Sequence, residues 1–297
     1  MMRKTKLFMD TVVDIQVVVT NHPRNKAAAA IDRAFEVFRK VEQACSRFSQ
    51  DSEVMQATRQ IQTAVKISPF LFEPLRFALE VAEVTDGMLD PTIGKVMEDH
   101  GFNQHYLTGE TFHSPVSESA SYQDIILDDE RRTLFINKPL VIDLGAVAKG
   151  FAIDLAAHEL KDFEGFIVNA GGDLFAGGLD GQGRKWKIGI QHPMHKDQVI
   201  QTIELSNEAV CTSGSYERKS PLRADVHHLI NPNTKCSSNE WTSCSVISRY
   251  AFMADAFSTA AFLLPIDRGE ALLSNVNLMG ILIDRDLKVY RVGGDLI

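Results

Sequence analysis

Four short segments combine residue types that can carry chemistry. The first runs from Ile142 to Asp154 and contains Asp143, two glycines and Lys149. A carboxylate followed by a glycine turn and the start of a helix exposes backbone N–H groups beside a cation, which suits a bound phosphate. A tight turn into a helix, with the lysine in solvent, explains the same residues equally well.

The second segment is Asn-Ala-Gly-Gly-Asp at residues 169–173, directly after an apolar run. Paired glycines allow a ligand to approach the backbone closely, but they are equally typical of an ordinary turn. Considered alone, the segment is interpreted as a turn.

The third segment, residues 226–232, contains the adjacent histidines His227 and His228. Neighbouring side chains of an extended chain point in opposite directions, so at most one of the two faces a given site. A histidine here could orient a phosphate or accept a proton near neutral pH. Structural histidines are commoner, so the segment alone favours that interpretation.

The fourth segment, residues 254–260, contains Asp255 and Thr259. On a helix these residues lie one turn apart on the same face. Both present oxygen, the donor type that magnesium prefers. Because a carboxylate in an apolar helix is unfavourable without a partner, a bound cation is favoured over a simple Asp–Thr hydrogen bond.

Helices are expected early in the chain to position these segments. Apolar residues from Ala28 to Cys45 recur at three- and four-residue steps, which predicts an amphipathic helix. A second helix is expected to begin at Ser68 and Pro69 and to end near Gly87, and Pro74 should divide or kink it. The range 7–20 before them is predicted to be a strand.

The rest of the chain alternates strand-like runs with two helices. A helix should begin near residue 145 or 146 and end near residue 160, and another is indicated over residues 251–264. This order predicts an α+β fold with mainly antiparallel sheets. We expect a single unit over residues 1–297, which leaves room for two lobes with no readable boundary. The strand-like runs are 125–127, 133–136, 140–143, 166–168, 186–190, 199–205, 243–248, 279–284 and 288–292.

Composition excludes several classes of protein. The chain has 297 residues, and 31 Lys and Arg against 39 Asp and Glu give a net charge of −8. Such a charge disfavours sequence-independent nucleic-acid binding. The four cysteines form no CxxC pair or zinc quartet, and no segment reads as a signal peptide or a membrane span. We therefore expect a cytoplasmic protein without membrane insertion.

In combination, the segments resemble the FAD:protein FMN transferase family, also called the ApbE family. The resemblance covers nearly the whole chain because its motifs occur in the family's order. They are residues 8–11 (Phe-Met-Asp-Thr), 47–53 (Arg-Phe-Ser to Ser-Glu), 88–94 (Met-Leu-Asp-Pro-Thr-Ile-Gly), 143–150 (Asp-Leu-Gly-Ala-Val-Ala-Lys-Gly), 171–173 (Gly-Gly-Asp), 213–218, 227–232, and the pair 255 and 259.

The resemblance implies a T-fold-like core and an enzyme that uses FAD as substrate with Mg2+. FMN would be transferred to a Thr or Ser hydroxyl of an acceptor flavoprotein, and AMP would leave. His228 and Asp143 are the catalytic candidates, with His228 as the general base and Asp143 or Asp255 as rivals for that role. The implied FAD contacts are Met9, Phe48, Met88, Leu89, Asp90, Asp143, Lys149 and His228, and the implied metal ligands are the Ala146 carbonyl, Asp255 and Thr259.

Two alternatives stay open. An FAD pyrophosphatase would admit water in place of the protein hydroxyl, and a non-catalytic FAD-binding module would lack a competent metal site. The sequence also departs from the family pattern His-His-x-x-Asp-Pro-x-Thr-Gly, because Asn231 and Lys235 replace the acid and the glycine.

Overall fold

The computed structural model describes residues 1–114, 116 and 120–293, and the chain divides into two compact units. Unit 1 comprises residues 1–39, 149–216 and 239–297, and unit 2 comprises residues 40–148 and 217–238. Two of the points where the chain passes between units lie in helix α1 (Arg24–Cys45) and at the start of α5 (Ala148–Leu160). Since these points carry no linker composition, the sequence gives no sign of them.

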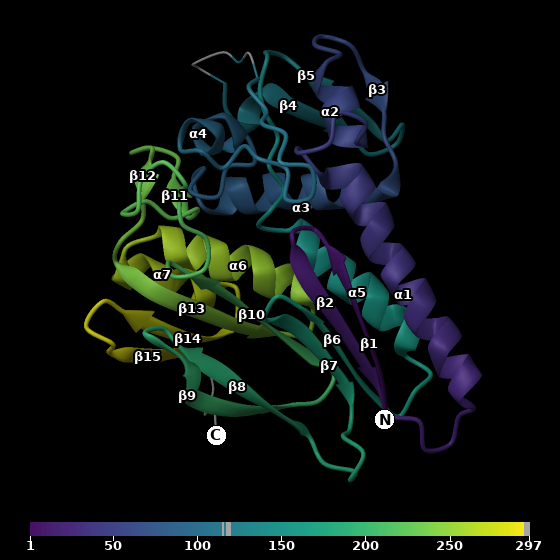
Figure 1. The fold of residues 1–297 in the computed structure, drawn as a ribbon. Helices are drawn as coiled ribbons and strands as arrows, with labels where there is room; N and C mark the ends of the chain where they lie inside the picture. The colour runs from purple at the N-terminus through teal and green to yellow at the C-terminus, as the bar shows by residue number, and fades with distance from the viewer. Residues whose placement is uncertain (115, 117–119, 294–297) are drawn as a thin grey trace. The chain divides into compact units, whose positions relative to one another are not determined.

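An eight-stranded sheet forms the framework of unit 1, in the order β1-β2-β6-β7-β10-β13-β14-β15 (Figure 1). Every neighbouring pair in it is antiparallel. The strands are β1 (Met2–Phe8), β2 (Thr11–Val17), β6 (Gly165–Ala170), β7 (Asp173–Gly178), β10 (Glu208–Gly214), β13 (Trp241–Ser248), β14 (Met279–Asp284) and β15 (Val289–Val292).

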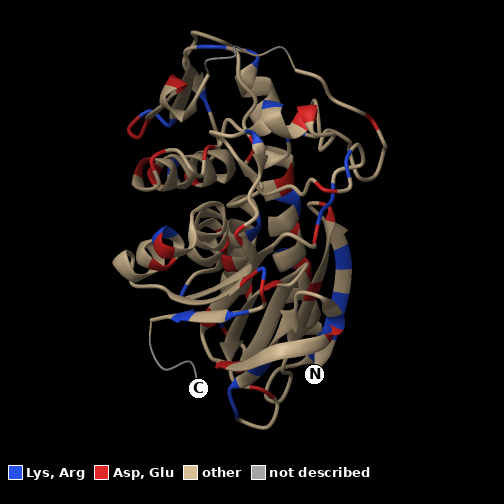
Figure 2. Cartoon of the chain, turned by 90° about the vertical axis from the view of Figure 1, so that its left-hand side faces the viewer, with Lys and Arg blue, Asp and Glu red and all other residues tan. Residues whose placement is uncertain are grey.

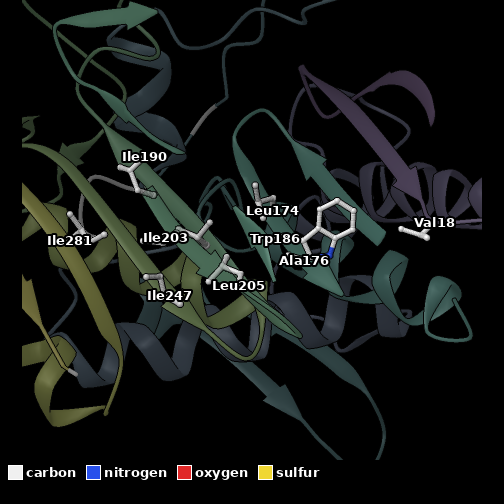
Figure 3. Packing of buried hydrophobic residues seen from close by; sticks show 10 residues of the cluster. Val18, Leu174, Ala176, Trp186, Ile190, Ile203, Leu205, Ile247 and Ile281 are labelled. Atoms are coloured by element: carbon white, nitrogen blue, oxygen red, sulfur yellow. The ribbon is translucent and has the colours of Figure 1, made fainter. Parts of the chain in front are cut away.

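Different elements cover the two faces of this sheet. Helix α6 (Ala251–Leu263) packs on β7, β10 and β13, and α7 (Ile266–Asn275) packs on α6 and the β14–β15 hairpin. The hairpin of β8 (Trp186–His192) and β9 (His195–Leu205) lies on the opposite face (Figure 1). Its buried side chains meet those of the sheet in one apolar cluster (Figure 3). Both faces of the central strands are thus buried, which makes the sheet a rigid support for side chains at its strand ends.

Unit 2 combines short helices with two small sheets. A three-stranded sheet has the order β3-β5-β4, and β11 pairs with β12. The elements are α2 (Glu53–Thr58), β3 (Val65–Lys66), α3 (Pro69–Val84), α4 (Gly94–Asp99), the 3₁₀ helix η1 (Tyr122–Asp124), β4 (Ile125–Asp128), β5 (Thr133–Ile136), β11 (Ile230–Asn231) and β12 (Cys236–Ser237). The predicted α+β class with antiparallel pairing is confirmed. No helix within the described ranges is long and apolar enough to cross a membrane.

Of the two effects expected of Pro74, a division or a kink, the division of its helix is not found. Helix α3 runs unbroken from Pro69 to Val84 with Pro74 buried inside it. A proline there cannot donate to the carbonyl four residues earlier. That carbonyl, of Phe70, instead accepts a hydrogen bond from Cys45 Sγ at 3.3 Å. This tertiary hydrogen bond replaces the backbone hydrogen bond that the Phe70 carbonyl cannot receive from Pro74.

Two predicted strands also need correction. The range 7–20 is not one strand, because β1 and β2 form a hairpin that turns at Met9 and Asp10. Residues 140–143 form no strand, and the Asp143 N–H donates to the Pro91 carbonyl at 2.8 Å outside any ladder. The turn over residues 169–173 is confirmed, since Gly171 and Gly172 join β6 to β7 with positive φ angles of 66° and 104°.

Candidate active site

In unit 1, Lys149 lies between two buried carboxylates at the start of α5. Its ammonium group pairs with Asp173, the first residue of β7, and lies 3.5 Å from Asp255 Oδ1 on α6. Asp255 Oδ2 accepts the Gly150 N–H at 2.9 Å, and Asp173 accepts the Thr212 N–H at 2.8 Å. Lys149, Asp173 and Asp255 are called the lysine–carboxylate cluster below.

Burial and charge oppose each other in this cluster. Burial raises the pKa of Asp255, and Lys149 only partly counteracts this effect. Burial lowers the pKa of Lys149, but Asp173 and Asp255 more than offset it, so the pKa of Lys149 lies above its usual value. Lys149 is therefore a fixed cation, whereas burial disfavours the charged form of Asp255, which a further cation would stabilise.

Two of the three oxygen donors expected to bind magnesium, Asp255 and Thr259, lie one turn apart on α6. Thr259 Oγ1 is 3.0 Å from Ser213 Oγ of β10, which is 2.9 Å from Ser258 Oγ. Such oxygens fit the preference of Mg2+ for hard donors. Across the described ranges, no three His, Cys, Asp or Glu side chains are placed to hold one ion. A magnesium ion at Asp255 would therefore need hydroxyl, carbonyl, phosphate or water oxygens as well.

The hairpin turn of β1 and β2 holds Met9 in an unusual conformation. Met9 and Asp10 have φ angles of 52° and 59°, and Phe8 and Thr11 form the closing pair. Two-residue hairpin loops of this kind usually contain Asn or Gly, because other side chains are strained at positive φ. Strain of this kind is concentrated at functional positions, which agrees with the predicted role of Met9.

In unit 2, Asp143 is held by an arginine. Arg47 Nε donates to Asp143 Oδ2 at 2.5 Å, and the Gly145 N–H donates to Oδ1 at 2.8 Å. Burial raises the pKa of Asp143, but the charge of Arg47, the Gly145 hydrogen bond and the charge of Arg218 together bring the pKa below its usual value. Asp143 is therefore ionised at neutral pH, which suits an acceptor of hydrogen bonds better than a general base.

The aromatic residue expected at the flavin packs against the same arginine. The guanidinium carbon of Arg47 lies 4.1 Å from the centroid of the Phe48 ring. The structure thus brings Phe48 and Asp143 together through Arg47. The Ala146 carbonyl belongs to the turn at residues 145–147 that precedes α5, where the N–H groups of Val147 and Ala148 donate to the Leu144 carbonyl.

The loop of Met88, Leu89 and Asp90 is fixed mainly by its own residues. Asp90 Oδ1 accepts hydrogen bonds from the N–H and the hydroxyl of Thr92, both at 2.7 Å. Burial raises the pKa of Asp90 and these bonds lower it only in part, so the pKa lies above its usual value. Leu89 and Met88 are buried, and the Met88 sulfur accepts from Asn233 Nδ2 at 3.4 Å. Oδ1 of Asp90 is thus directed into its own loop, and Oδ2 accepts the Tyr122 N–H at 3.4 Å.

The two histidines occupy different environments. His227 is 2% exposed, and its Nε2 lies 2.7 Å from the Ser238 carbonyl. His228 is half-buried, and its N–H donates to the carbonyl of Arg218 at 3.1 Å. The charge of Arg218 also lowers the pKa of Asp143, so the residue whose carbonyl accepts the His228 N–H is within electrostatic range of Asp143.

The departures from the family pattern are accommodated in the loop between β11 and β12. Asn231 Oδ1 accepts hydrogen bonds from the N–H groups of Asn233 and Thr234, at 2.9 and 3.1 Å, as an aspartate there could. Lys235 has a φ of 54°, the left-handed conformation that glycine adopts without strain. Asn231 in place of aspartate keeps the turn. Lys235 in place of glycine carries a conformational cost, because a side chain is strained at this positive φ.

Two residues that complete the site have no role assigned by the sequence. Asp173 follows the paired glycines and fixes Lys149, and Arg47 precedes Phe48 and fixes Asp143. Their motifs are visible in the sequence. Their partners are 24 and 96 residues away along the chain, so only the fold reveals the pairing.

Known proteins are similar to this chain in sequence and in fold. The chain is 27% identical over 270 residues to the FAD:protein FMN transferase of Haemophilus influenzae, covering 84% of this chain and 76% of that protein. It is 29% identical over 245 residues to the Chlamydia trachomatis protein of the same name, with 79% and 75% covered. The crystal structure of the ApbE protein from Thermotoga maritima matches with a TM-score of 0.84 and 27% identity, over 98% of this chain and 96% of that one.

The flavin transferase ApbE from Vibrio cholerae has the same fold, with a TM-score of 0.83, 23% identity, and 98% and 96% of the two chains covered. The family model described as "ApbE family" matches residues 9–282, a range that contains every predicted site residue. The assignment made from the sequence is thus confirmed, and the relatives named here are transferases. The chain belongs to the ApbE family.

Proposed function

We propose that this protein is a magnesium-dependent FAD:protein FMN transferase that acts as a single catalytic unit over the whole chain. The hydroxyl oxygen of an acceptor Thr or Ser would form a bond to the phosphorus on the FMN side of FAD. The bond from that phosphorus to the bridging oxygen would break, and AMP would leave with the bridging oxygen. The observation that carries the proposal is the lysine–carboxylate cluster, which lies within the family match.

The cluster provides what cleavage of a pyrophosphate requires. Phosphoryl transfer depends mainly on positioning and on neutralising the charge of the phosphate oxygens. The ammonium group of Lys149 is held by Asp173 and stays protonated, so it can face a phosphate oxygen. Asp255 and Thr259 offer oxygens to a magnesium ion, with the Ala146 carbonyl as a third donor. Magnesium would neutralise phosphate charge as a Lewis acid.

The remaining assignments concern the flavin nucleotide and the proton. Asp143, ionised beside Arg47, would accept hydrogen bonds from FAD, and Phe48 and Met9 would contact it, with Met88, Leu89 and Asp90 in the adjoining loop. His228 would take the proton of the acceptor hydroxyl. The lowered pKa of Asp143 supports His228 for this role rather than Asp143.

The proposal is tested by mass. The protein is incubated with FAD, magnesium and a candidate acceptor, and the intact acceptor mass and the released AMP are measured. An FMN-sized gain on the acceptor together with AMP is expected. Free FMN and AMP without labelling would indicate a pyrophosphatase instead, and stable FAD binding without AMP under any divalent ion would indicate a binding module.

Asp255→Ala is the test of the metal assignment. Magnesium-dependent AMP release should become undetectable, because the carboxylate ligand is lost. The circular dichroism spectrum should be unchanged, since Lys149 keeps its pair with Asp173. Asp267→Ala, in the exposed first turn of α7, serves as the matched control. Full turnover in Asp255→Ala would rule out this metal site.

A further inference from the structure

Arg47 is held on several sides in unit 2. The residue is 4% exposed, and its Nη2 donates to the Phe102 carbonyl at 2.6 Å. Its Nε donates to Asp143, and its guanidinium carbon lies over the Phe48 ring. A planar guanidinium with contacts in two directions in its plane and one above it has a fixed orientation. It therefore fixes the Asp143 carboxylate and the Phe48 ring, which it contacts.

One feature of Arg47 argues against a purely structural role. Its third nitrogen, Nη1, is buried and has no hydrogen-bond partner within the described part of the chain. A buried donor without a partner opposes folding, and a buried ion pair adds little net stability compared with apolar packing. Stability alone would thus not favour an arginine at this position.

We propose that Arg47 is a positioning residue for FAD, which orients the Asp143 carboxylate and the Phe48 ring so that both contact the flavin nucleotide. This inference rests on the proposed function, in which Asp143 and Phe48 contact FAD. Arg47 acts through these two residues.

The charges around Asp143 show how the arginine acts. The groups that face this carboxylate are the guanidinium of Arg47, the N–H of Gly145 and the more distant charge of Arg218. Burial opposes ionisation, and Arg47 is the largest of the effects that favour it. Without Arg47, burial would prevail and the pKa of Asp143 would rise.

Arg47→Gln and Arg47→Lys separate the two parts of this role. The dissociation constant of FAD is measured with a metal chelator present, so that no turnover occurs. Arg47→Gln should bind FAD about 10- to 100-fold more weakly, with a further loss as the pH is lowered, because Asp143 then becomes protonated at a higher pH than in the wild type. Arg47→Lys keeps the charge but not the fork of donors, so it should bind with intermediate affinity and little pH dependence.

Arg76→Gln is the matched control, since its ion pairs with Glu73 and Glu80 are largely exposed, and its affinity for FAD should equal that of the wild type. Wild-type affinity and pH profile in Arg47→Gln would overturn the inference. If Arg47→Gln does not fold, wild-type affinity in both Arg47→Lys and Asp143→Asn would overturn it.

Failure of the proposed function has a different signature. A pyrophosphatase or a binding module would still bind FAD, so the comparison of Arg47 variants with the wild type would stand unchanged. If FAD is not the ligand at all, the wild type itself would not bind it. The positioning role is then tested without ligand, by following the Asp143 carboxyl carbon by ¹³C NMR as the pH is lowered. The chemical shift of this carbon should differ from the wild type in both Arg47→Lys and Arg47→Gln. The pH at the titration midpoint should differ in Arg47→Gln. Identical spectra would overturn the inference in that case too.

Discussion

At the scale of single residues, the adjacent histidines show how the fold separates two side chains that the sequence cannot rank. His227 has both ring nitrogens engaged, since Nε2 contacts the Ser238 carbonyl and Nδ1 accepts from the Leu229 N–H at 3.3 Å. Its N–H also donates to Ser237 Oγ at 2.9 Å. A ring held in this way stabilises the loop, whereas the half-buried His228 is better placed to meet a substrate.

Alanine substitutions should therefore separate stability from activity. His227→Ala leaves buried partners unsatisfied and should lower the free energy of unfolding by about 1–3 kcal/mol. His228→Ala should keep its unfolding free energy and slow FMN transfer by about 10²–10⁴-fold without abolishing FAD binding. Chemical denaturation and single-turnover AMP release measure the two effects. Equal activity losses in the two variants, or the reverse order, would contradict the assignment of His228.

At the scale of elements, α5 and α6 approach each other so closely that only glycine fits between them. A Cβ on Gly150 would lie 2.4 Å from the Ala251 carbonyl oxygen and 2.8 Å from the Asp255 Cβ. Asp154, one turn further along α5, accepts the N–H groups of Ala251 and Phe252 at 2.8 and 3.0 Å and so caps α6. Together these contacts set the position of Asp255 relative to Lys149.

Gly150→Ala should disturb this contact. Alanine favours a helix by about 1 kcal/mol over glycine, but the clash is with backbone that no rotamer change relieves. A net loss of about 1–3 kcal/mol in the free energy of unfolding is expected, together with reduced magnesium-dependent turnover. Gly181→Ala, where an added Cβ meets nothing within 4 Å, should be neutral. A stabilised and fully active Gly150→Ala would show that the helices adjust freely.

The elements also show how far sequence reasoning extends. The stripe from Ala28 to Cys45 predicts α1, and the hairpins of residues 125–136 and 279–292 are confirmed, because periodicity and turn residues are local signals. The β1–β2 hairpin is missed because its turn contains Met9 and Asp10 in place of the usual Asn and Gly. The division expected at Pro74 is absent, and a contact distant in sequence, from Cys45, compensates for the missing donor.

In the candidate site, too, local signals can be predicted from the sequence and contacts between distant residues cannot. Asp255 and Thr259 are one helical turn apart, so the sequence alone places them on one face of a helix. The pairing of Lys149 with Asp173, and of Arg47 with Asp143, depends on the order of strands and on loop packing. No local pattern encodes these pairings, and they determine which groups carry charge.

At the scale of the whole molecule, an acidic protein must bind an anionic substrate. Lysine and arginine residues are interspersed with acidic ones along the ribbon (Figure 2). With a net charge of −8, long-range attraction of FAD is not expected. On the proposed function, affinity must therefore come from local groups such as Lys149 and from the proposed magnesium ion.

Ligand binding should accordingly be visible as metal-dependent stabilisation of the folded chain. A ligand at 100 times its dissociation constant adds about 2.7 kcal/mol to the free energy of unfolding. Because roughly 2–4 °C accompany each kcal/mol in proteins of comparable size, FAD with magnesium should raise the melting temperature by about 5–10 °C. Differential scanning fluorimetry with an extrinsic dye that does not overlap flavin emission measures the shift.

Three comparisons make this measurement specific. A chelator should remove part of the shift, since it would take away the ion proposed at Asp255 and leave the residues of unit 2 that are proposed to bind the flavin nucleotide. With magnesium present, FAD should raise the melting temperature of Asp255→Ala only as much as it raises that of the wild type with the chelator. NAD carries the same adenosine and pyrophosphate without a flavin, so it should give a smaller shift. Equal melting-temperature shifts with NAD and FAD would mean that Phe48 and Met9 do not recognise the flavin. The same shift with and without magnesium would mean that no ion at Asp255 contributes to FAD binding.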